Sequence, residues 1–184
     1  KLKIGLISDD LKLSYRMNHE LNRANSSIHD LAITENFLVF FDLPLLTHGG
    51  RISWEPDKGG KIILFDKKFE KSPIDFAIQS CFVFHFINAF EKDGNVVVYA
   101  CRWPKYPNEI DIPQIYEWKL NLTSGQVVER AVCEFSAEMP SINPQFTAIE
   151  NKYCYTTKSA YLPPQHLNTF TKTDLQSGES EIFN

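Results

Sequence analysis

The segment YEWKLNLTSG at residues 116–125 has a second copy of its pattern, FTKTDLQSG, at residues 170–178. In both copies, aromatic and β-branched residues that favour strands lead into a turn of the form Asx-Leu-x-Ser-Gly. The turns end at Gly125 and Gly178, 53 residues apart, near the upper end of the periods of β-propeller blades. Because two copies of a common turn can arise by chance, the repeat favours a propeller while a sandwich and a barrel stay open.

Strand patterns dominate the rest of the chain as well. The segment 14–24 is the one competitor for a helix, but its apolar residues are poorly spaced, and we expect a loop or a short helical turn there. The sequence Lys-Asp-Gly-Asn at residues 92–95 predicts a hairpin turn. Short apolar runs bounded by turn residues predict an all-β protein with strands at 3–8, 27–34, 37–43, 52–54, 61–65, 82–89, 96–102, 115–120, 127–135, 152–157 and 169–173.

Composition and charge exclude several classes of protein. The 184 residues are 43% hydrophobic and 23% charged with a net charge of −4, which is an ordinary globular balance rather than that of a disordered chain. Lys and Arg are scattered, so no nucleic-acid partner is expected. No apolar run is long enough to cross a bilayer, and no signal peptide is visible. Because the chain opens at Lys1 without an initiator Met, we expect it to be a piece of something longer.

The cysteines are expected to pack in the core rather than to bind a metal or carry out redox chemistry. They form no CxxC pair and lie among apolar or aromatic neighbours, so a zinc ribbon or thioredoxin-type site is not indicated. Buried free thiols in a reducing compartment are favoured over disulfides for all four: Cys81, Cys101, Cys133 and Cys154.

Two histidines lie in strand-like segments. His29 begins the run HDLAIT at residues 29–34, and alternation places His85 on one face with Val83 and Ile87. The residue pattern by itself favours a core histidine over a metal ligand at His85. The spacing of the histidines cannot change this preference, because metal sites assembled from separate strands have no fixed ligand spacing. The other histidines lie in polar or Gly- and Pro-rich surroundings and are expected at the surface: His19, His48 and His166.

Three ordered phrases resemble the carotenoid cleavage oxygenases, a family that includes lignostilbene dioxygenases and the retinoid isomerohydrolase of the eye. The first phrase is HDLAITENFLVFFDLPL at residues 29–45, and the second is CFVFHFINAFE at residues 81–91. The third is EMPSINP at residues 138–144, followed by KYCY at residues 152–155. Together they cover roughly residues 27 to 157, most of the chain.

The resemblance implies a seven-bladed β-propeller with Fe(II) on its axis, bound by four histidines from inner strands. His29 matches the second of these metal ligands and His85 the third, and Glu138 matches a glutamate that holds a ligand histidine by a hydrogen bond. The phrases that carry the first and fourth ligands do not occur here. We therefore expect residues 1–184 to form one partial β-propeller domain of about three blades, a central fragment that is inactive alone.

The implied activity is that of a non-haem dioxygenase. Its partners would be O2 and a hydrophobic polyene, a carotenoid or apocarotenoid, of which one carbon–carbon double bond is cleaved. Peripheral membrane contact is compatible with such a substrate, and an intracellular location in cytoplasm or plastid is favoured. Lignostilbene-type cleavage of a stilbene, a propeller that only binds a partner, and an unrelated sandwich stay open as alternatives.

Two glutamates compete for the same role. Glu134 and Glu138 are four residues apart, so alternation would place both on one face of a straight strand. Pro140 cannot donate to a ladder, so we expect the strand to end or bulge there and to turn Glu138 inward. Because a buried carboxylate needs a partner, we predict a hydrogen bond between Glu138 and His85, with His29 facing the same centre. Both histidines should lie on the innermost strands of their blades.

Overall fold

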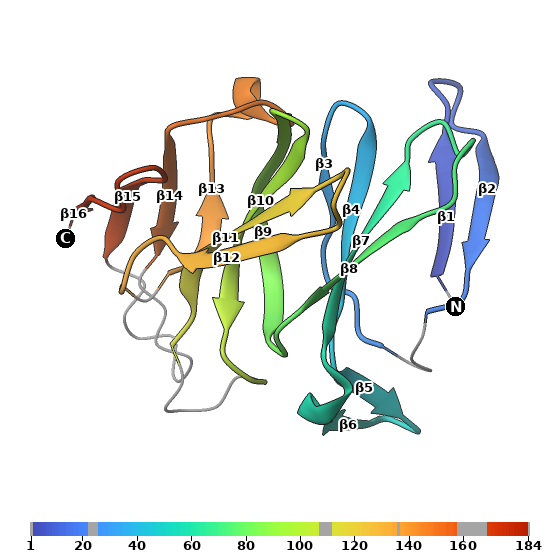
Figure 1. Cartoon of the computed structure of the whole chain (residues 1–184), viewed down its shortest axis with the longest axis horizontal. Helices are drawn as coiled ribbons and strands as arrows, with labels where there is room; N and C mark the ends of the chain where they lie inside the picture. Colours follow the sequence, from blue (N-terminus) through green and yellow to red (C-terminus); the bar gives the residue numbers. More distant parts are fainter. Residues whose placement is uncertain (1, 22–25, 107–111, 136, 158–168, 184) are drawn as a thin grey trace.

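The computed structural model describes residues 2–21, 26–106, 112–135, 137–157 and 169–183. Strands dominate these residues and pair antiparallel throughout (Figure 1). The only helical elements within them are two short 3-10 turns, η1 (Pro56–Lys58) and η2 (Pro144–Phe146). A search of the described residues finds no helix with the length and hydropathy needed to cross a membrane.

Three four-stranded sheets follow one another along the chain, and we call them the first, second and third blades. The first contains β3 (Ala32–Ile33), β4 (Phe37–Asp42), β7 (Gly60–Asp66) and β8 (Ile74–Ile78). The second contains β9 (Phe82–Lys92), β10 (Asn95–Trp103), β11 (Gln114–Asn121) and β12 (Val127–Ala131). The third contains β13 (Glu138–Ser141), β14 (Tyr153–Thr157), β15 (Phe170–Asp174) and β16 (Ser180–Phe183).

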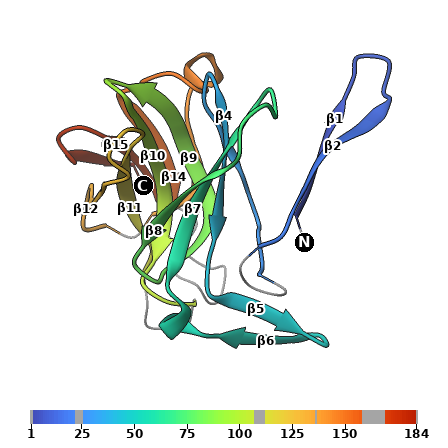
Figure 2. The ribbon, with the colours of Figure 1, turned by 45° about the vertical axis from the view of Figure 1, so that its right-hand side comes forward.

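Two hairpins complete the described fold. The first pairs β1 (Leu2–Ile7) with β2 (Leu13–His19), and its tip points away from the blades (Figure 2). The second pairs β5 (Leu45–His48) with β6 (Arg51–Trp54) at the lower edge of Figure 1.

The first strand of each blade is its innermost one. β9 lies beside both β3 and β13, although the three strands belong to different sheets (Figure 1). Successive sheets that meet through their first strands are consecutive blades, so the predicted all-β fold and partial β-propeller are confirmed.

Side-chain alternation fills a separate core at each contact between neighbouring sheets. Phe41 of β4 and Val96 of β10 belong to the core between the first and second blades. The adjacent residues point the other way: Phe40 packs with Ile4 of the β1–β2 hairpin, and Val97 packs in the core between the second and third blades. The first and second blades therefore each have two apolar faces, as expected for stacked sheets.

The repeated phrase adopts the same turn in two blades. The side chains of Asn121 and Asp174 each accept hydrogen bonds from the backbone N–H groups two and three residues later, at 2.7–3.1 Å. Gly125 and Gly178 then take left-handed backbone angles, with φ of 72° and 79°. These turns join β11 to β12 and β15 to β16, the third and fourth strands of their blades, so the repeat does mark equivalent blade positions.

Several predicted boundaries were wrong. The segment 14–24 was expected as a loop or helical turn, but it contains most of β2, which pairs with β1 and packs Met17 against the first blade. The expected strand at 27–34 is shortened to β3, and the one at 127–135 ends at Ala131. Besides β2, the strands that the sequence analysis missed are short ones: β5, β8, β13 and β16. The hairpin turn at 92–95 is confirmed, with Asp93 and Gly94 at positive φ.

Candidate functional site

His85 lies on β9, where the strand departs from regular pairing. β9 has 11 residues and β10 has nine, and the two strands pair from Phe82 with Trp103 to Lys92 with Asn95. Two extra residues in β9 therefore have to bulge, and the two register shifts lie around Ala100, opposite this part of β9. Such bulges re-aim side chains, and they place His85 at the inner edge of the second blade.

The bulges also correct the predicted alternation. Val83 and Ile87 were expected on one face together with His85, but they lie in different cores. Val83 packs between the first and second blades, and Ile87 packs between the second and third. Simple alternation fails here because each extra residue shifts the side-chain period of β9 by one.

The predicted hydrogen bond between His85 and Glu138 is present. The two groups are 2.7 Å apart, from Nδ1 of His85 to Oε2 of Glu138, and the Glu138 side chain is 7% exposed. The indole Nε1 of Trp103 donates to Oε1 of Glu138 at 2.6 Å, and the backbone N–H of Met139 donates to Oε2 at 3.0 Å. Since an ionised carboxylate only accepts, Nδ1 of His85 is the donor and Nε2 is left to bind something else.

A bulge turns Glu138 inward, as predicted. Between β13 and β14, Glu138 pairs with Thr157 and Ser141 pairs with Tyr155. The chain therefore advances three residues on β13 where it advances two on β14, which is a β-bulge. Met139 takes a left-handed backbone angle, φ 50°, immediately before Pro140. The competing residue, Glu134, is exposed and does not contact His85.

His29 lies beside His85 but not on a strand. It was expected on the innermost strand of its blade, yet it precedes β3 by three residues and belongs to no strand, and its side chain is exposed. Its ring centroid is 5.2 Å from that of His85 and 5.4 Å from that of Phe84, in edge-on contacts. The two histidine rings are therefore in direct contact, and His85 does lie on the innermost strand of its blade.

Asp30 connects the two histidine segments. Its Oδ2 accepts the backbone N–H of Phe86 at 3.0 Å, and its Oδ1 accepts the N–H of Leu31 at 2.8 Å. Sequence reasoning assigned no role to Asp30, although it lies inside the phrase that contains His29. It also missed Trp103, whose partner Glu138 is 35 residues away along the chain.

The pair of imidazoles fits a metal ion in part. Rings this close can share one cation, since metal–imidazole bonds are about 2.0–2.1 Å long. Imidazole is a common ligand for iron, and a carboxylate on Nδ1 is the usual way to orient such a ligand. Within the described part of the chain, no group of three or more His, Cys, Asp or Glu side chains is arranged to hold a metal ion. His29 and His85 thus supply an incomplete ligand set.

Two further histidines in the described residues, His19 and His48, lie outside this arrangement. His19 was expected at the surface, but it is half-buried and packs edge-on against Phe65 with ring centroids 5.0 Å apart. His48 is exposed in β5, as expected. His166 lies outside the described residues.

The four cysteines are free and buried, which confirms the prediction of thiols. Burial raises the pKa of Cys81 and of Cys154 to about 12, and it also raises the pKa of Cys101 and Cys133. At neutral pH these groups remain protonated, so they are poor nucleophiles.

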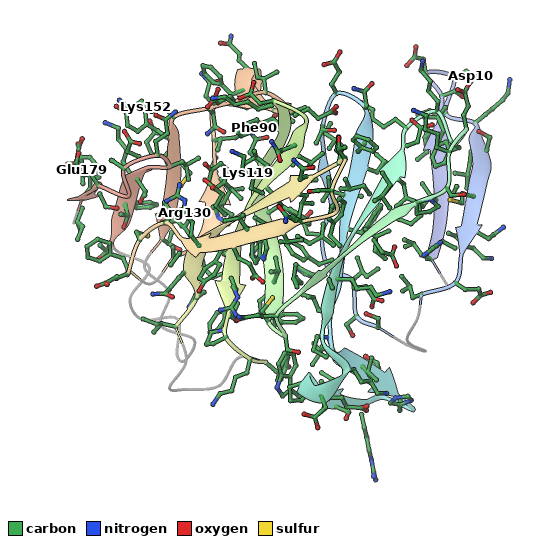
Figure 3. All side chains as sticks on the ribbon, viewed as in Figure 1. Asp10, Phe90, Lys119, Arg130, Lys152 and Glu179 are labelled. Atoms are coloured by element: carbon green, nitrogen blue, oxygen red, sulfur yellow. The ribbon has the colours of Figure 1, made fainter. Side chains whose placement is uncertain are left out.

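Two cavities flank the second blade. A cavity of about 320 Å³ lies next to the histidine segments and is lined by residues 30–33, 86–89, Ile142 and Thr147. Its lining is mostly aliphatic. A second cavity, of about 360 Å³, lies on the side that faces the third blade, and its lining is charged. It includes Lys119 and Arg130 beside Phe90 (Figure 3).

A family model described as retinal pigment epithelial membrane protein matches residues 1–184, the whole chain. The chain belongs to this family. The membership agrees with the resemblance carried by the three phrases, because several relatives are carotenoid or apocarotenoid oxygenases.

Three proteins that resemble this family member are oxygenases. A carotenoid 9,10(9',10')-cleavage dioxygenase of Phaseolus vulgaris is 28% identical over 151 residues, which are 71% of this chain and 28% of that enzyme. An isoeugenol monooxygenase of Pseudomonas putida is 24% identical over 151 residues, or 70% of this chain and 31% of that enzyme. A solved variant of the Synechocystis apocarotenoid oxygenase superposes with a TM-score of 0.83 at 22% identity, over 99% of this chain and 43% of that one. The chain thus spans less than a third of the length of these two curated relatives.

Proposed function

We propose that the complete protein carrying this chain is an Fe(II)-dependent oxygenase that cleaves one carbon–carbon double bond of a carotenoid or apocarotenoid. The observation that carries this proposal is His85, held at Nδ1 by the buried Glu138 and facing the ring of His29 at 5.2 Å, in a chain that matches the family throughout. Residues 1–184 would form a single partial propeller domain, and the other metal ligands would come from elsewhere in the protein.

In this proposal each residue has a definite task. His29 and His85 would hold the iron, and Glu138 would fix the tautomer and orientation of His85. Trp103 and the Met139 backbone keep the Glu138 carboxylate in place. When bound, Fe(II) would supply the activation of O2 that cleavage of the double bond requires. The reaction balances as one alkene plus one O2 giving two carbonyl products.

The chemistry of the neighbouring cavity supports an apolar substrate. Leu31, Ala32, Ile33, Ile87 and Ile142 line it, so a hydrocarbon chain would meet mainly aliphatic surface there. An intracellular location in cytoplasm or plastid and peripheral contact with a membrane belong to the same proposal, since polyenes of this kind dissolve in lipid.

One of the similar proteins supports a second class of substrate. The relative from Pseudomonas putida is an isoeugenol monooxygenase, which acts on a phenylpropenoid. Cleavage of a stilbene or phenylpropenoid is therefore the alternative, and assaying an apocarotenoid, a stilbene and isoeugenol side by side would distinguish the two classes.

The decisive test compares three variants of the complete protein: His85→Ala, Glu138→Gln and, as a matched control, His48→Ala in the β5–β6 hairpin. We expect His85→Ala to abolish cleavage and to lower bound iron. Glu138→Gln should reduce iron affinity or activity about 10–100-fold, the usual effect of losing a partner that orients a metal ligand.

The control His48→Ala should retain the iron content and activity of the unaltered protein. Iron content and product formation both serve as readouts. Unchanged iron and cleavage in His85→Ala, or an unaltered protein without bound iron, would contradict the proposal. Residues 1–184 alone should release no product, because they hold only two of the proposed ligands.

A further inference from the structure

The segment that carries His29 is attached to the second blade by side chains rather than by strand pairing. β3 and β9 are edge strands of different sheets, so no ladder of backbone hydrogen bonds joins them. In the described part of the chain, two carboxylates bridge residues 29–36 and β9. Asp30 accepts from Phe86, and Glu91 accepts from Thr34 and Asn36.

Asp30 makes its bridge at the histidines themselves. Asp30 follows His29 in the chain, and Phe86 follows His85, so the 3.0 Å hydrogen bond joins the immediate neighbours of both rings. The second oxygen of Asp30 accepts from Leu31 at 2.8 Å, which fixes the carboxylate relative to its own backbone. One side chain thus couples the backbone position of one histidine to that of the other.

We propose that Asp30 is a positioning residue that sets the separation of His29 and His85, and this role rests on the proposed function, in which both rings bind one iron. His29 needs such a device because it lies outside any strand and its side chain is exposed. Besides the edge-on contacts of its ring with Phe84 and His85, the Asp30 bridge holds this part of the chain against β9.

Glu91 provides a matched control. It joins the same two blades with three hydrogen bonds of 2.6–2.9 Å, but it does so six residues further along β9, away from His85. A change that merely loosens the contact between the two blades should act alike at both carboxylates. A change in the spacing of the histidines should arise at Asp30 only.

The test uses the complete protein and its variants Asp30→Ala, Asp30→Asn and Glu91→Ala. The affinity for Fe(II), and for Co(II) as a spectroscopic probe, is measured by competition with a chelator, and the melting temperature is measured without metal. We expect Asp30→Ala to raise the metal Kd at least about 10-fold, the lower end for loss of a supporting partner. Asp30→Asn keeps one acceptor oxygen and should fall between Asp30→Ala and the unaltered protein.

Glu91→Ala should lower the melting temperature as much as Asp30→Ala does while leaving the metal Kd within about 2-fold of the unaltered protein. If Asp30→Ala does not fold, Asp30→Asn carries the comparison. Equal Kd values for the Asp30 variants and the unaltered protein, or equal losses of affinity at Asp30 and Glu91, would overturn this role alone. Failure of the unaltered protein to bind either metal would overturn the proposed function, and this role with it.

Discussion

At the scale of single residues, the Glu138 carboxylate accepts hydrogen bonds from His85, Trp103 and its own neighbour Met139. A buried carboxylate without donors would be costly, and three donors offset that cost. The same three bonds leave the carboxylate one orientation, so the ring of His85 is held in one orientation as well. Trp103 is itself 1% exposed, which keeps water from replacing its indole donor.

Replacing Trp103 by Phe tests this arrangement. Trp103→Phe keeps an aromatic ring but removes the indole N–H, so we expect the free energy of unfolding to fall by about 2–3 kcal/mol. Metal affinity should also fall, because Glu138 loses one of its donors. Denaturant unfolding of the metal-free protein and the Fe(II) Kd measure the two effects.

Trp118→Phe is the matched control for Trp103→Phe. Trp118 is also fully buried, and its Nε1 donates to another carboxylate, Glu129, at 2.9 Å. Trp118→Phe should therefore reduce stability by a similar amount and leave the metal Kd unchanged. Equal changes in Kd for both variants would show that Trp103 supports the fold of the second blade rather than the site.

A contact between two residues could be predicted only where both residues belong to phrases that resemble the family. Glu138 and His85 belong to separate phrases of one family, so their hydrogen bond could be predicted across 53 residues. Trp103 belongs to neither phrase, and nothing local marks it as a partner for Glu138. The exposed position of His29 ahead of β3 could not be foreseen either, because it depends on the Asp30 bridge to another blade.

At the scale of elements, strands with long apolar runs were predicted, whereas β2 and several short strands were not. β10, with its run of Val residues, is buried on both faces and was found nearly to its ends. β13 has four residues, contains Pro140 and bulges at Met139, so it has no clear strand pattern. The repeated turns were found because an Asx side chain followed by Ser-Gly closes the turn through local hydrogen bonds alone.

Those turns offer a comparison between two glycines of similar conformation. Gly125 and Gly178 have φ of 72° and 79°, so alanine at either should cost about 1–2 kcal/mol of stability from backbone strain. Nothing lies within 4 Å of a Cβ added at Gly125. A Cβ added at Gly178 would lie 2.1 Å from the carbonyl oxygen of Val132, which directly follows β12 of the second blade. Gly178→Ala should therefore cost about 1–3 kcal/mol more than Gly125→Ala.

Thermal or denaturant unfolding of the two glycine variants in the same protein measures that difference, and Gly125→Ala serves as the control for backbone strain. Equal losses of stability would mean that the contact between Gly178 and Val132 can relax. The close approach would then contribute nothing to how the second and third blades meet.

At the scale of the whole molecule, apolar cores stack the blades and polar side chains of β9 align them. Asn88 donates to the carbonyl oxygens of Phe146 and Ile149, both at 2.9 Å, and so connects β9 to the third blade. Glu91 accepts from Thr34 and Asn36 of the first blade. Alternation and turns, which are local, predicted the strands, and the family resemblance predicted the blades. These bridges were not predictable, because each joins residues more than 50 positions apart.

The Glu91 bridge should make the contact between the first two blades depend on pH. Burial acts to raise the pKa of Glu91, but hydrogen bonds from Thr34 and Asn36 outweigh it, so the pKa lies below its usual value of 4.5. A carboxyl group with a lowered pKa in the folded state stabilises the fold fully above the ordinary glutamate pKa. This contribution is lost as the pH falls through the lowered value.

Glu91→Gln removes the charge while keeping the size of the side chain. We expect the variant to be less stable than the unaltered protein by about 1 kcal/mol at pH 7, a modest value because Glu91 is only half-buried. The difference should shrink steadily below about pH 4.5, since protonation then makes Glu91 neutral as well. Urea unfolding of both proteins from pH 3 to pH 8 measures it. A difference that stays constant over this range would mean that the Glu91 charge does not hold the two blades together, and that shape and apolar packing alone align them.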